Sequence, residues 1–431
     1  MDAVHEIPHG PTRTVGTKDP RTVAAAGGAD SSTPEDSVPD HTDRDLADRV
    51  LAIRKRRRLS QLDLAGASGL SLSYITKLEN RDPSCRNPRL ATLRKLAKGL
   101  GSGVTTTILQ GGQGDAEPAD TATLDIWEPV RHALAAPPEA DGDPATAAEV
   151  RAELLRLQSE MAAHNYEAMA ADVPSLLRAS AAIDDRGLRS HSLGMVGWLL
   201  TQNRQWDDAA LVLDQAIEAA DDETTAAAAV ATRVWGELRQ GHLDPARALA
   251  LEWADRIEPK FSRASLGQLA AWGRLWLFVA TIAVRDNRQH EYEDAIGLAR
   301  AAASRIGREV LTEASTTRQF GPITVEHVAV EAAALTEQPR LALTIAERTP
   351  AADLLPGAAG RLRHRLDVAN AHTQLGNWGD AMGELNSLAA AAPEWIVQQR
   401  YSRDIVGAMI DRRRTLTEEM RELADLVHLE V

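Results

Sequence analysis

The stretch GLSLSYITKLENR, residues 69–81, carries several hydrogen-bonding side chains close together. Its Ser, Tyr, Thr and Lys residues fall on the open side of a short expected helix, whereas Ile75 and Leu78 point inward. Hydroxyl and ammonium groups in this arrangement donate and accept hydrogen bonds but do not form a catalytic set. We therefore expect this helix to contact a polar partner.

The rest of the chain offers no residues at catalytic spacing. The sequence contains no phosphate-binding loop, no serine elbow and no Cys/His group with the spacing of a metal site. His364 and His372 are eight residues apart on one expected helix, which is too far for a shared metal ion without other ligands. We predict that the protein is not an enzyme and that it uses no cofactor and no metal.

Charge is distributed unevenly along the chain. The net charge is −14, yet residues 44–98 carry 14 Lys and Arg against 5 Asp and Glu, a local balance of +9 that leaves −23 elsewhere. A basic segment joined to an acidic body suggests a polyanionic partner for one end only. A charged run can equally well do no more than solvate a helix.

Short helices separated by turns must hold the open helix in place. We expect a first helix over 43–57, a second capped by Ser60 and a third capped by Ser71. Gly69 is expected to form the tight turn between the second and third helices. Asn80 is expected to end the third helix in the left-handed conformation.

The phrases LSQ, LA, GLS, YI and LEN follow one another within LSQLDLAGASGLSLSYITKLEN. This order and spacing resemble the helix-turn-helix of Cro and the phage repressors, the XRE family, over roughly 44–109. The resemblance implies a small helical bundle whose third helix enters the major groove of double-stranded DNA. The loop RDPSCRNPR, residues 81–89, is longer than the family's usual turn. A helical bundle that docks on another protein remains the alternative.

The resemblance also implies which side chains touch DNA. Base edges would be contacted by Leu72, Ser73, Thr76 and Lys77. Phosphates would be contacted by Gln61, Ser71, Tyr74, Arg81, Arg86 and Arg89.

The acidic body repeats one phrase, in which a polar turn precedes an acidic residue and an alanine that opens a helix. The marker alanines are Ala168, Ala209, Ala246, Ala295, Ala342 and Ala381. Gaps of about 40 residues between them fit two helices per unit. The series resembles tetratricopeptide repeats, which stack into an α-solenoid with a concave groove. Together with the Cro-like segment it resembles large regulators of actinobacteria, and an Ala- and Arg-rich, Lys-poor composition agrees.

Aligning the units on their marker alanines selects positions that should face the groove. These are Trp198, Trp235, Trp272, Trp276, His327, Glu331, Arg363 and Asn370. An aromatic half and a polar half would suit an extended peptide or a small amphipathic molecule. Tryptophans in helical repeats are also common core residues, and a helix histidine is commonly structural, so these alternatives remain open.

We therefore expect an all-α protein with a disordered tail at 1–42, a helix-turn-helix domain at 43–109, a linker with a short helical segment at 110–146, and a tetratricopeptide-like α-solenoid at 147–431. One cysteine, Cys85, fits a reducing compartment, and LWLFVATIAV, residues 275–284, is too short to cross a membrane. The expected location is the cytoplasm.

These observations favour a transcriptional regulator that binds double-stranded DNA, works as a homodimer, and senses a peptide or small-molecule effector in its repeats. The alternative is a repeat platform that docks a partner protein, with DNA binding secondary.

Overall fold

The computed structural model describes residues 46–57, 59–85, 88, 90–101, 104, 109, 126–135, 145–312, 315–349, 354, 359–412 and 416–429. Within these residues the protein is all-α apart from one short β-hairpin, which confirms the predicted fold class. The predicted tail at 1–42 and most of the predicted linker lie outside the described residues.

The basic segment folds into α1 (Leu46–Arg56), α2 (Gln61–Ser68), α3 (Leu72–Glu79), a 3-10 turn η2 (Pro83–Cys85) and α4 (Leu90–Leu100). Its core is formed by the inward apolar residues of all four helices, including Val50, Leu64, Ile75, Leu78 and Leu96. Because helices this short are marginal alone, this shared core is what holds them together.

Local capping sets the ends of α2 and α3, as predicted. Ser60 accepts a hydrogen bond from the backbone N–H of Asp63, whose carboxylate in turn accepts from the N–H of Ser60. Ser71 accepts from the N–H of Tyr74, and Gly69 adopts φ +67° in the turn. The prediction for Asn80 is wrong. Asn80 has φ −86°, and the left-handed residue is the next one, Arg81, at φ +58°.

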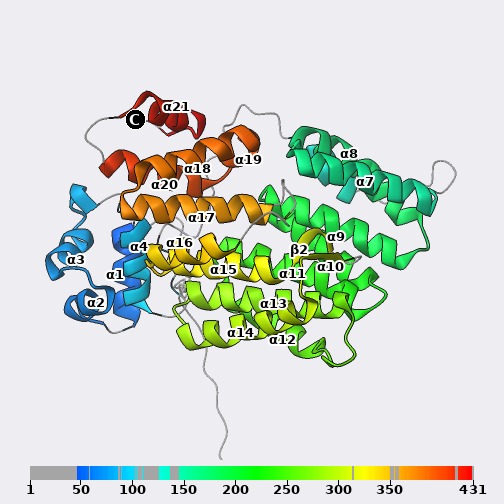
Figure 1. The fold of residues 1–431 in the computed structure, drawn as a ribbon, viewed down its shortest axis with the longest axis horizontal. Helices are drawn as coiled ribbons and strands as arrows, with labels where there is room; N and C mark the ends of the chain where they lie inside the picture. The colour runs from blue at the N-terminus through cyan, green and yellow to red at the C-terminus, as the bar shows by residue number, and fades with distance from the viewer. Residues whose placement is uncertain are drawn as a thin grey trace, which may run out of the picture. The chain divides into compact units, whose positions relative to one another are not determined.

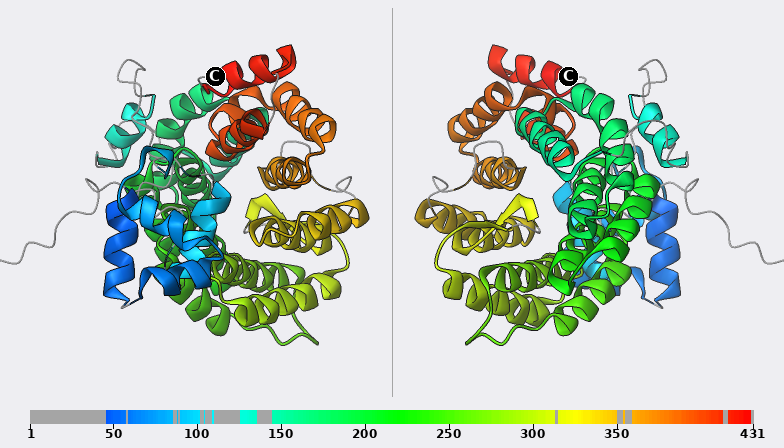
Figure 2. Two further views of the ribbon diagram at one scale, coloured as in Figure 1. Left: turned by 90° about the vertical axis from the view of Figure 1, so that its left-hand side faces the viewer. Right: turned by 90° about the vertical axis from the view of Figure 1, so that its right-hand side faces the viewer.

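The acidic body is a series of antiparallel helical hairpins (Figure 1). Its helices are α6 (Glu128–Ala135), α7 (Ala147–Ala163), α8 (Tyr166–Ala182), α9 (Arg186–Gln202), α10 (Trp206–Ala219), α11 (Glu223–Gln240), α12 (Leu243–Arg256), α13 (Leu266–Arg285), α14 (Gln289–Ile306), α15 (Pro322–Leu335), α16 (Pro339–Arg348), α17 (Ala359–Leu375), α18 (Trp378–Ala391), α19 (Pro393–Val397), α20 (Arg400–Arg412) and α21 (Glu418–Leu426). The pairs from α9–α10 to α17–α18 follow one another along a curved path (Figure 2).

One turn conformation recurs inside these hairpins. A residue with positive φ directly precedes the N-cap of the second helix at six places: His164, Arg204, Gly241, Asn287, Glu337 and Gly376. Four residues after the cap, the N–H of Ala209, Ala246, Ala342 or Ala381 donates to the cap carbonyl at 2.8–3.1 Å. These four alanines are at most 2% exposed. The repeated phrase therefore encodes a tight turn followed by close helix packing.

The helical body begins earlier than the predicted boundary at residue 147. Helix α6 packs against α8, and Trp127 and Val130 are buried with residues of α7, α8 and α9. The short helical segment assigned to the linker thus belongs to the core of the first hairpins.

The β-hairpin was not predicted from the sequence. Strands β1 (Val310–Thr312) and β2 (Ser315–Phe320) pair antiparallel between α14 and α15, with Val310 opposite Phe320. Phe320 is 1% exposed and its ring fills the space above Gly273, where a Cβ atom would lie 2.2 Å from Cζ. This contact fixes the hairpin on α13.

Helix α13 is the one helix among the described residues that is long and apolar enough to span a membrane by length and composition alone. Its mean hydropathy is 1.3, and more than half of the apolar window is buried inside the protein. It packs against α11, α12, α14 and α15, as the central helix of a helical core does.

Candidate functional site

Helix α3 has one buried side and one open side. Ile75 and Leu78 are fully buried, whereas Leu72, Ser73 and Lys77 are exposed. The four residues predicted to contact bases therefore include three on the open side. The fourth, Thr76, is half-buried, and its hydroxyl lies 3.0 Å from the carbonyl of Leu72 and 3.1 Å from Oε1 of Gln61.

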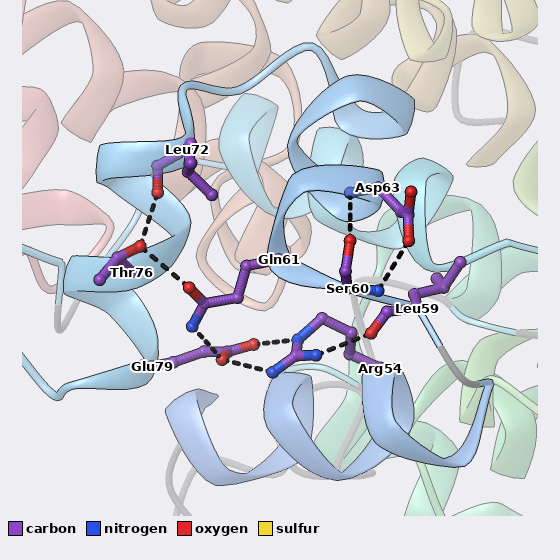
Figure 3. Close-up of polar contacts among 8 residues, drawn as sticks. All are labelled: Arg54, Leu59, Ser60, Gln61, Asp63, Leu72, Thr76 and Glu79. Atoms are coloured by element: carbon purple, nitrogen blue, oxygen red, sulfur yellow. Dashed lines mark hydrogen bonds and ion pairs between the residues drawn. The ribbon is translucent and has the colours of Figure 1, made fainter.

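A polar network fixes the inner side of α3 (Figure 3). Arg54 of α1 donates from Nε to Oε1 of Glu79 at 2.6 Å and from Nη2 to Oε2 at 2.7 Å. Its Nη1 donates to the carbonyl of Leu59 at 2.7 Å. The amide of Gln61 donates to Oε2 of Glu79 at 2.7 Å and accepts from Thr76. One carboxylate thus ties α1, α2 and α3 together.

The ion pair in this network is buried and satisfied. The side chains of Arg54 and Glu79 are only 11% and 4% exposed. Burial by itself raises the pKa of Glu79, but hydrogen bonds from Arg54 and Gln61 outweigh it, and the pKa lies below its ordinary value. The hydrogen bond to Glu79 also raises the pKa of Arg54. Both groups stay charged at neutral pH, so the orientation of α3 is fixed by charge-assisted hydrogen bonds.

The residues predicted to contact phosphate lie in different environments. Ser71 is exposed at the start of α3. Gln61 has both ends of its amide engaged within the network. Arg81 is exposed and pairs with Asp48 of α1 at 2.7 Å. Arg86 and Arg89 lie outside the residues whose side chains are described.

Tyr74, which is predicted to contact phosphate, is partly buried. Its ring packs against the core of the basic segment, and burial, together with the neighbouring Cys85, raises the pKa of its phenol to about 12. The aromatic ring lies on the apolar side of α3 because residue 74 is one helical turn before the buried Leu78. Tyr74 is thus partly buried against the core, and its contact with phosphate stays a prediction.

An exposed apolar residue was missed from the sequence. Leu62, in the first turn of α2, is 66% exposed, and Leu72 in the first turn of α3 is 43% exposed. Large apolar side chains that are exposed to solvent in the first turns of α2 and α3 are suited to contact sugar rings or a thymine methyl group. In the sequence, Leu62 directly follows Ser60 and Gln61 at the start of the helix, and this position in the first turn could have indicated an exposed leucine.

A cavity of about 1010 Å³ lies along the helical body. Its wall is formed mainly by the first helix of each hairpin, from α9 to α17, with β2 and α20, and residues of α2 and α4 in the basic segment also line it. Five of the eight residues predicted for the groove line it: Trp198, Trp235, His327, Glu331 and Arg363.

Three predicted groove residues, Trp272, Trp276 and Asn370, are not among the residues that line this cavity. Trp272 is 4% exposed and packs edge-on against Phe261 and Trp276, with ring centroids 5.5 and 5.9 Å away. Trp272 and Trp276 are one helical turn apart on the side of α13 that packs into the core. Asn370 lies on α17 beyond Asp367, which is the last residue of that helix to line the cavity.

Two neutral histidines form part of the cavity wall. The rings of His327 (α15) and His364 (α17) stack in parallel with centroids 3.6 Å apart. Burial lowers the pKa of His327 to about 3, helped by the neighbouring His364, and burial lowers the pKa of His364 to about 4. Within the described structure, Nε2 of His327 and Nδ1 of His364 have no hydrogen-bond partner. His364 was not among the predicted groove residues.

The cavity wall also contains two acidic residues, Glu331 and Asp367. Glu331 accepts from Arg285 at 2.5 Å. Asp367 is 4% exposed, and burial together with the nearby charge of Glu331 raises its pKa well above the ordinary value. The raised pKa favours the neutral carboxyl form of Asp367 in the cavity wall.

Residues 50–106 match the helix-turn-helix family. No curated protein and no solved structure gave a match to the chain. The protein therefore contains a DNA-binding helix-turn-helix domain of the XRE type within the predicted range 43–109.

Proposed function

We propose that this protein is a sequence-specific transcriptional regulator that reads DNA with α3 and senses an effector in its helical body. The observation that carries the first half is the family match at residues 50–106 together with an α3 whose open side is exposed and whose inner side is fixed by Arg54 and Glu79. A recognition helix needs this combination, because its reading side chains must be free while its orientation is fixed.

In the proposed complex, α3 lies in the major groove with Leu72, Ser73, Thr76 and Lys77 towards the base edges. Lys77 donates to guanine acceptors and Leu72 packs on a thymine methyl group. Thr76 keeps acceptor capacity on its hydroxyl oxygen, since its proton is directed within the protein. Ser71 supports the register through phosphate, together with Arg81, Arg86 and Arg89.

The helical body is proposed to be a tetratricopeptide-like solenoid that runs from α6 to α21. Its support is the recurring left-handed turn, the buried marker alanines and the paired helices. A cavity of about 1010 Å³ walled by the first helices of the hairpins provides space for a peptide or small-molecule effector. Homodimerisation is proposed because one helix-turn-helix makes few contacts, and two half-sites raise affinity. We also propose a cytoplasmic location and kinship with actinobacterial regulators, on the composition.

Genome-wide binding of the full-length protein in its own cell tests the proposal. A Ser73→Ala/Lys77→Ala variant removes a predicted base hydroxyl and a predicted base cation. Lys260→Ala is the matched control, because it removes one exposed positive charge from the helical body. We expect discrete peaks that share an inverted motif, lost in the double variant and kept in the control. Peaks that persist in the double variant, or an absence of any shared motif, would contradict the assignment of α3.

A further inference from the structure

Three arginines and two aromatic rings lie together in the wall of the cavity. Arg239 of α11, Arg274 of α13 and Arg318 of β2 all line it, together with Trp235 and Phe278. The guanidinium carbon of Arg318 lies 5.3 Å from the centroid of Trp235 and 5.8 Å from that of Phe278. Arg239 lies 5.1 Å from the same Trp235 ring. The aromatic faces orient the arginines but do not neutralise their charge.

Arg274 and Arg318 are held by neutral groups. Arg274 donates from Nη2 to the backbone carbonyls of Arg318, at 3.3 Å, and Gln319. Arg318 donates from Nη2 to Oγ1 of Thr232 at 2.7 Å. Neither arginine forms an ion pair with a carboxylate among the residues that the structure describes. Arg285 in the same wall does have such a partner, Glu331.

The acid whose charge acts on Arg274 is already engaged elsewhere. Glu309 accepts hydrogen bonds from the backbone N–H groups of Ile323, at 2.7 Å, and Thr324, at 3.0 Å. It also accepts from the hydroxyl of Thr324 at 2.7 Å. Glu309 therefore caps the start of α15 rather than pairing directly with the arginines.

Burial disfavours the positive charges of Arg274 and Arg318. Burial lowers the pKa of Arg274 to about 10. Burial together with repulsion by Arg274 lowers the pKa of Arg318 to about 9. Both side chains remain charged at neutral pH, and neither is paired directly with a carboxylate among the residues that the structure describes. An anion that enters the cavity removes this imbalance, because paired charges are tolerated in a low-dielectric site where like charges alone are not.

We propose that Arg274 and Arg318 form an anion-binding subsite of the cavity, which takes the carboxylate or phosphate group of a small ligand with a flat apolar body. The apolar body stacks on Trp235 and Phe278, and the head group accepts hydrogen bonds from Arg318. Arg274 holds the backbone of β2 and adds its charge. The proposal deepens the effector site and rests on the proposed function for its physiological meaning.

The stacked histidines independently indicate that the cavity is built for a polar ligand. His327 and His364 are more than nine-tenths buried, and each leaves a ring nitrogen without a partner in the described structure. Buried polar atoms without partners are costly in a folded protein. A ligand whose far end carries a hydroxyl, carbonyl or amide group satisfies them.

Isothermal titration calorimetry with three naphthalene compounds tests the subsite. Naphthalene-1-acetate and 1-naphthyl phosphate carry the two anionic head groups, and naphthalene-1-methanol is the neutral analogue. The proteins are full-length wild type, Arg318→Gln, Arg318→Lys and the control Arg300→Gln. Arg300 pairs with Glu326 on an exposed face, so its replacement makes the same charge change outside the cavity. Thermal melts show whether each variant is folded.

For the wild type, we expect at least one anion to bind at least about tenfold more tightly than the alcohol. Arg318→Gln should abolish this preference and leave the alcohol unchanged, while Arg318→Lys and Arg300→Gln should keep it. Which anion binds better distinguishes a carboxylate ligand from a phosphate ligand. Equal binding of alcohol and anions, an equal loss of all three in Arg318→Gln, or no binding at millimolar concentration would overturn the proposal.

A parallel titration of DNA separates this subsite from the proposed function. Fluorescence anisotropy measures the affinity of the protein for its operator with and without the preferred naphthyl anion. If the anion binds through Arg318 and operator affinity does not respond, the subsite stands and effector sensing fails. If operator affinity responds to the alcohol as strongly as to the anion, the subsite fails and effector sensing stands.

Discussion

Replacing Glu79 by Ala should destabilise the helix-turn-helix by more than any exposed ion pair contributes. The substitution removes the carboxylate that accepts from Arg54 at 2.6 and 2.7 Å and from Gln61 at 2.7 Å. It leaves the side chain of Arg54, which is 11% exposed, without its paired carboxylate. Breaking a buried pair from one side costs about 3–5 kcal/mol. We expect a loss of this size in the free energy of unfolding of the module.

The double variant Arg54→Met/Glu79→Leu distinguishes this reasoning from a simple packing defect. It removes both charges and fills the site with apolar side chains of similar length. Replacement of a whole buried pair in this way is often neutral or stabilising. We therefore expect the double variant to recover most of the loss, to within about 1 kcal/mol of wild type. Asp48→Ala breaks the exposed pair with Arg81 and serves as the control, with a cost below about 1 kcal/mol.

Hydrogen exchange measured by mass spectrometry is the appropriate assay. All nine tryptophans follow residue 126, so tryptophan fluorescence does not report on the module. Exchange of amides in α1 and α3 gives the opening free energy in the full-length protein. A loss below about 1 kcal/mol in Glu79→Ala, or a double variant as unstable as the single one, would refute the reasoning.

The same pair predicts a dependence on pH. The pKa of Glu79 is lower in the folded module than its ordinary value of 4.5. Its contribution to stability is therefore present above about pH 4.5 and is lost as pH falls through the folded pKa. Protection of α3 should fall more steeply with acid in wild type than in Arg54→Met/Glu79→Leu. If protection falls equally steeply with acid in both proteins, the proposed role of Glu79 is contradicted.

Three further predictions concern the helical body. Gly241 has φ +82°, so Gly241→Ala should lower the free energy of unfolding by about 1–2 kcal/mol. The control Gly297→Ala, at an exposed position inside a helix, should raise it by about 0.5–1 kcal/mol. Urea denaturation measures both, and equal effects would contradict the claim that the turn requires glycine. Gly273→Ala should lower the free energy of unfolding by about 1–3 kcal/mol in the same assay, because the new methyl group clashes with the ring of Phe320. An unchanged free energy of unfolding would contradict the claim that Phe320 is packed rigidly on α13. Because the stacked histidines have pKa values of about 3 and 4, the free energy of unfolding of the protein should fall as pH drops below about 6.5, by up to about 1.4 kcal/mol per pH unit for each ring. Thermal melts between pH 7 and 5 measure this. The same pH dependence in a His327→Phe/His364→Phe variant would contradict it.

Much of the DNA-binding module could be predicted because its signals are local. A serine followed by an apolar run sets a helix start, and glycine sets a left-handed turn, so Ser60, Ser71 and Gly69 were assigned correctly. Asn80 was not, because Arg81 takes the left-handed conformation while it pairs with Asp48 of α1. That pairing depends on tertiary contact, which the local sequence does not contain.

The helical body shows the same division. The marker alanines identified the hairpins because each lies at a fixed distance from a tight turn. The groove was only partly predictable, because the repeated phrase does not determine which side of α13 faces the cavity and which side packs into the core. Trp272 and Trp276 turn to the core, and Arg274 turns to the cavity. Arg318 belongs to β2, a strand between α14 and α15 that carries none of the repeated helical phrase.

The most direct test of the account is the affinity of purified protein for the operator motif found by genome-wide binding. Fluorescence anisotropy with this duplex and a scrambled duplex compares wild type, Ser73→Ala/Lys77→Ala and Lys260→Ala. If α3 reads DNA, the double variant binds the operator at least about tenfold more weakly and loses its preference over the scrambled duplex, while Lys260→Ala matches wild type. An unchanged operator affinity in the double variant would contradict the claim that α3 reads DNA.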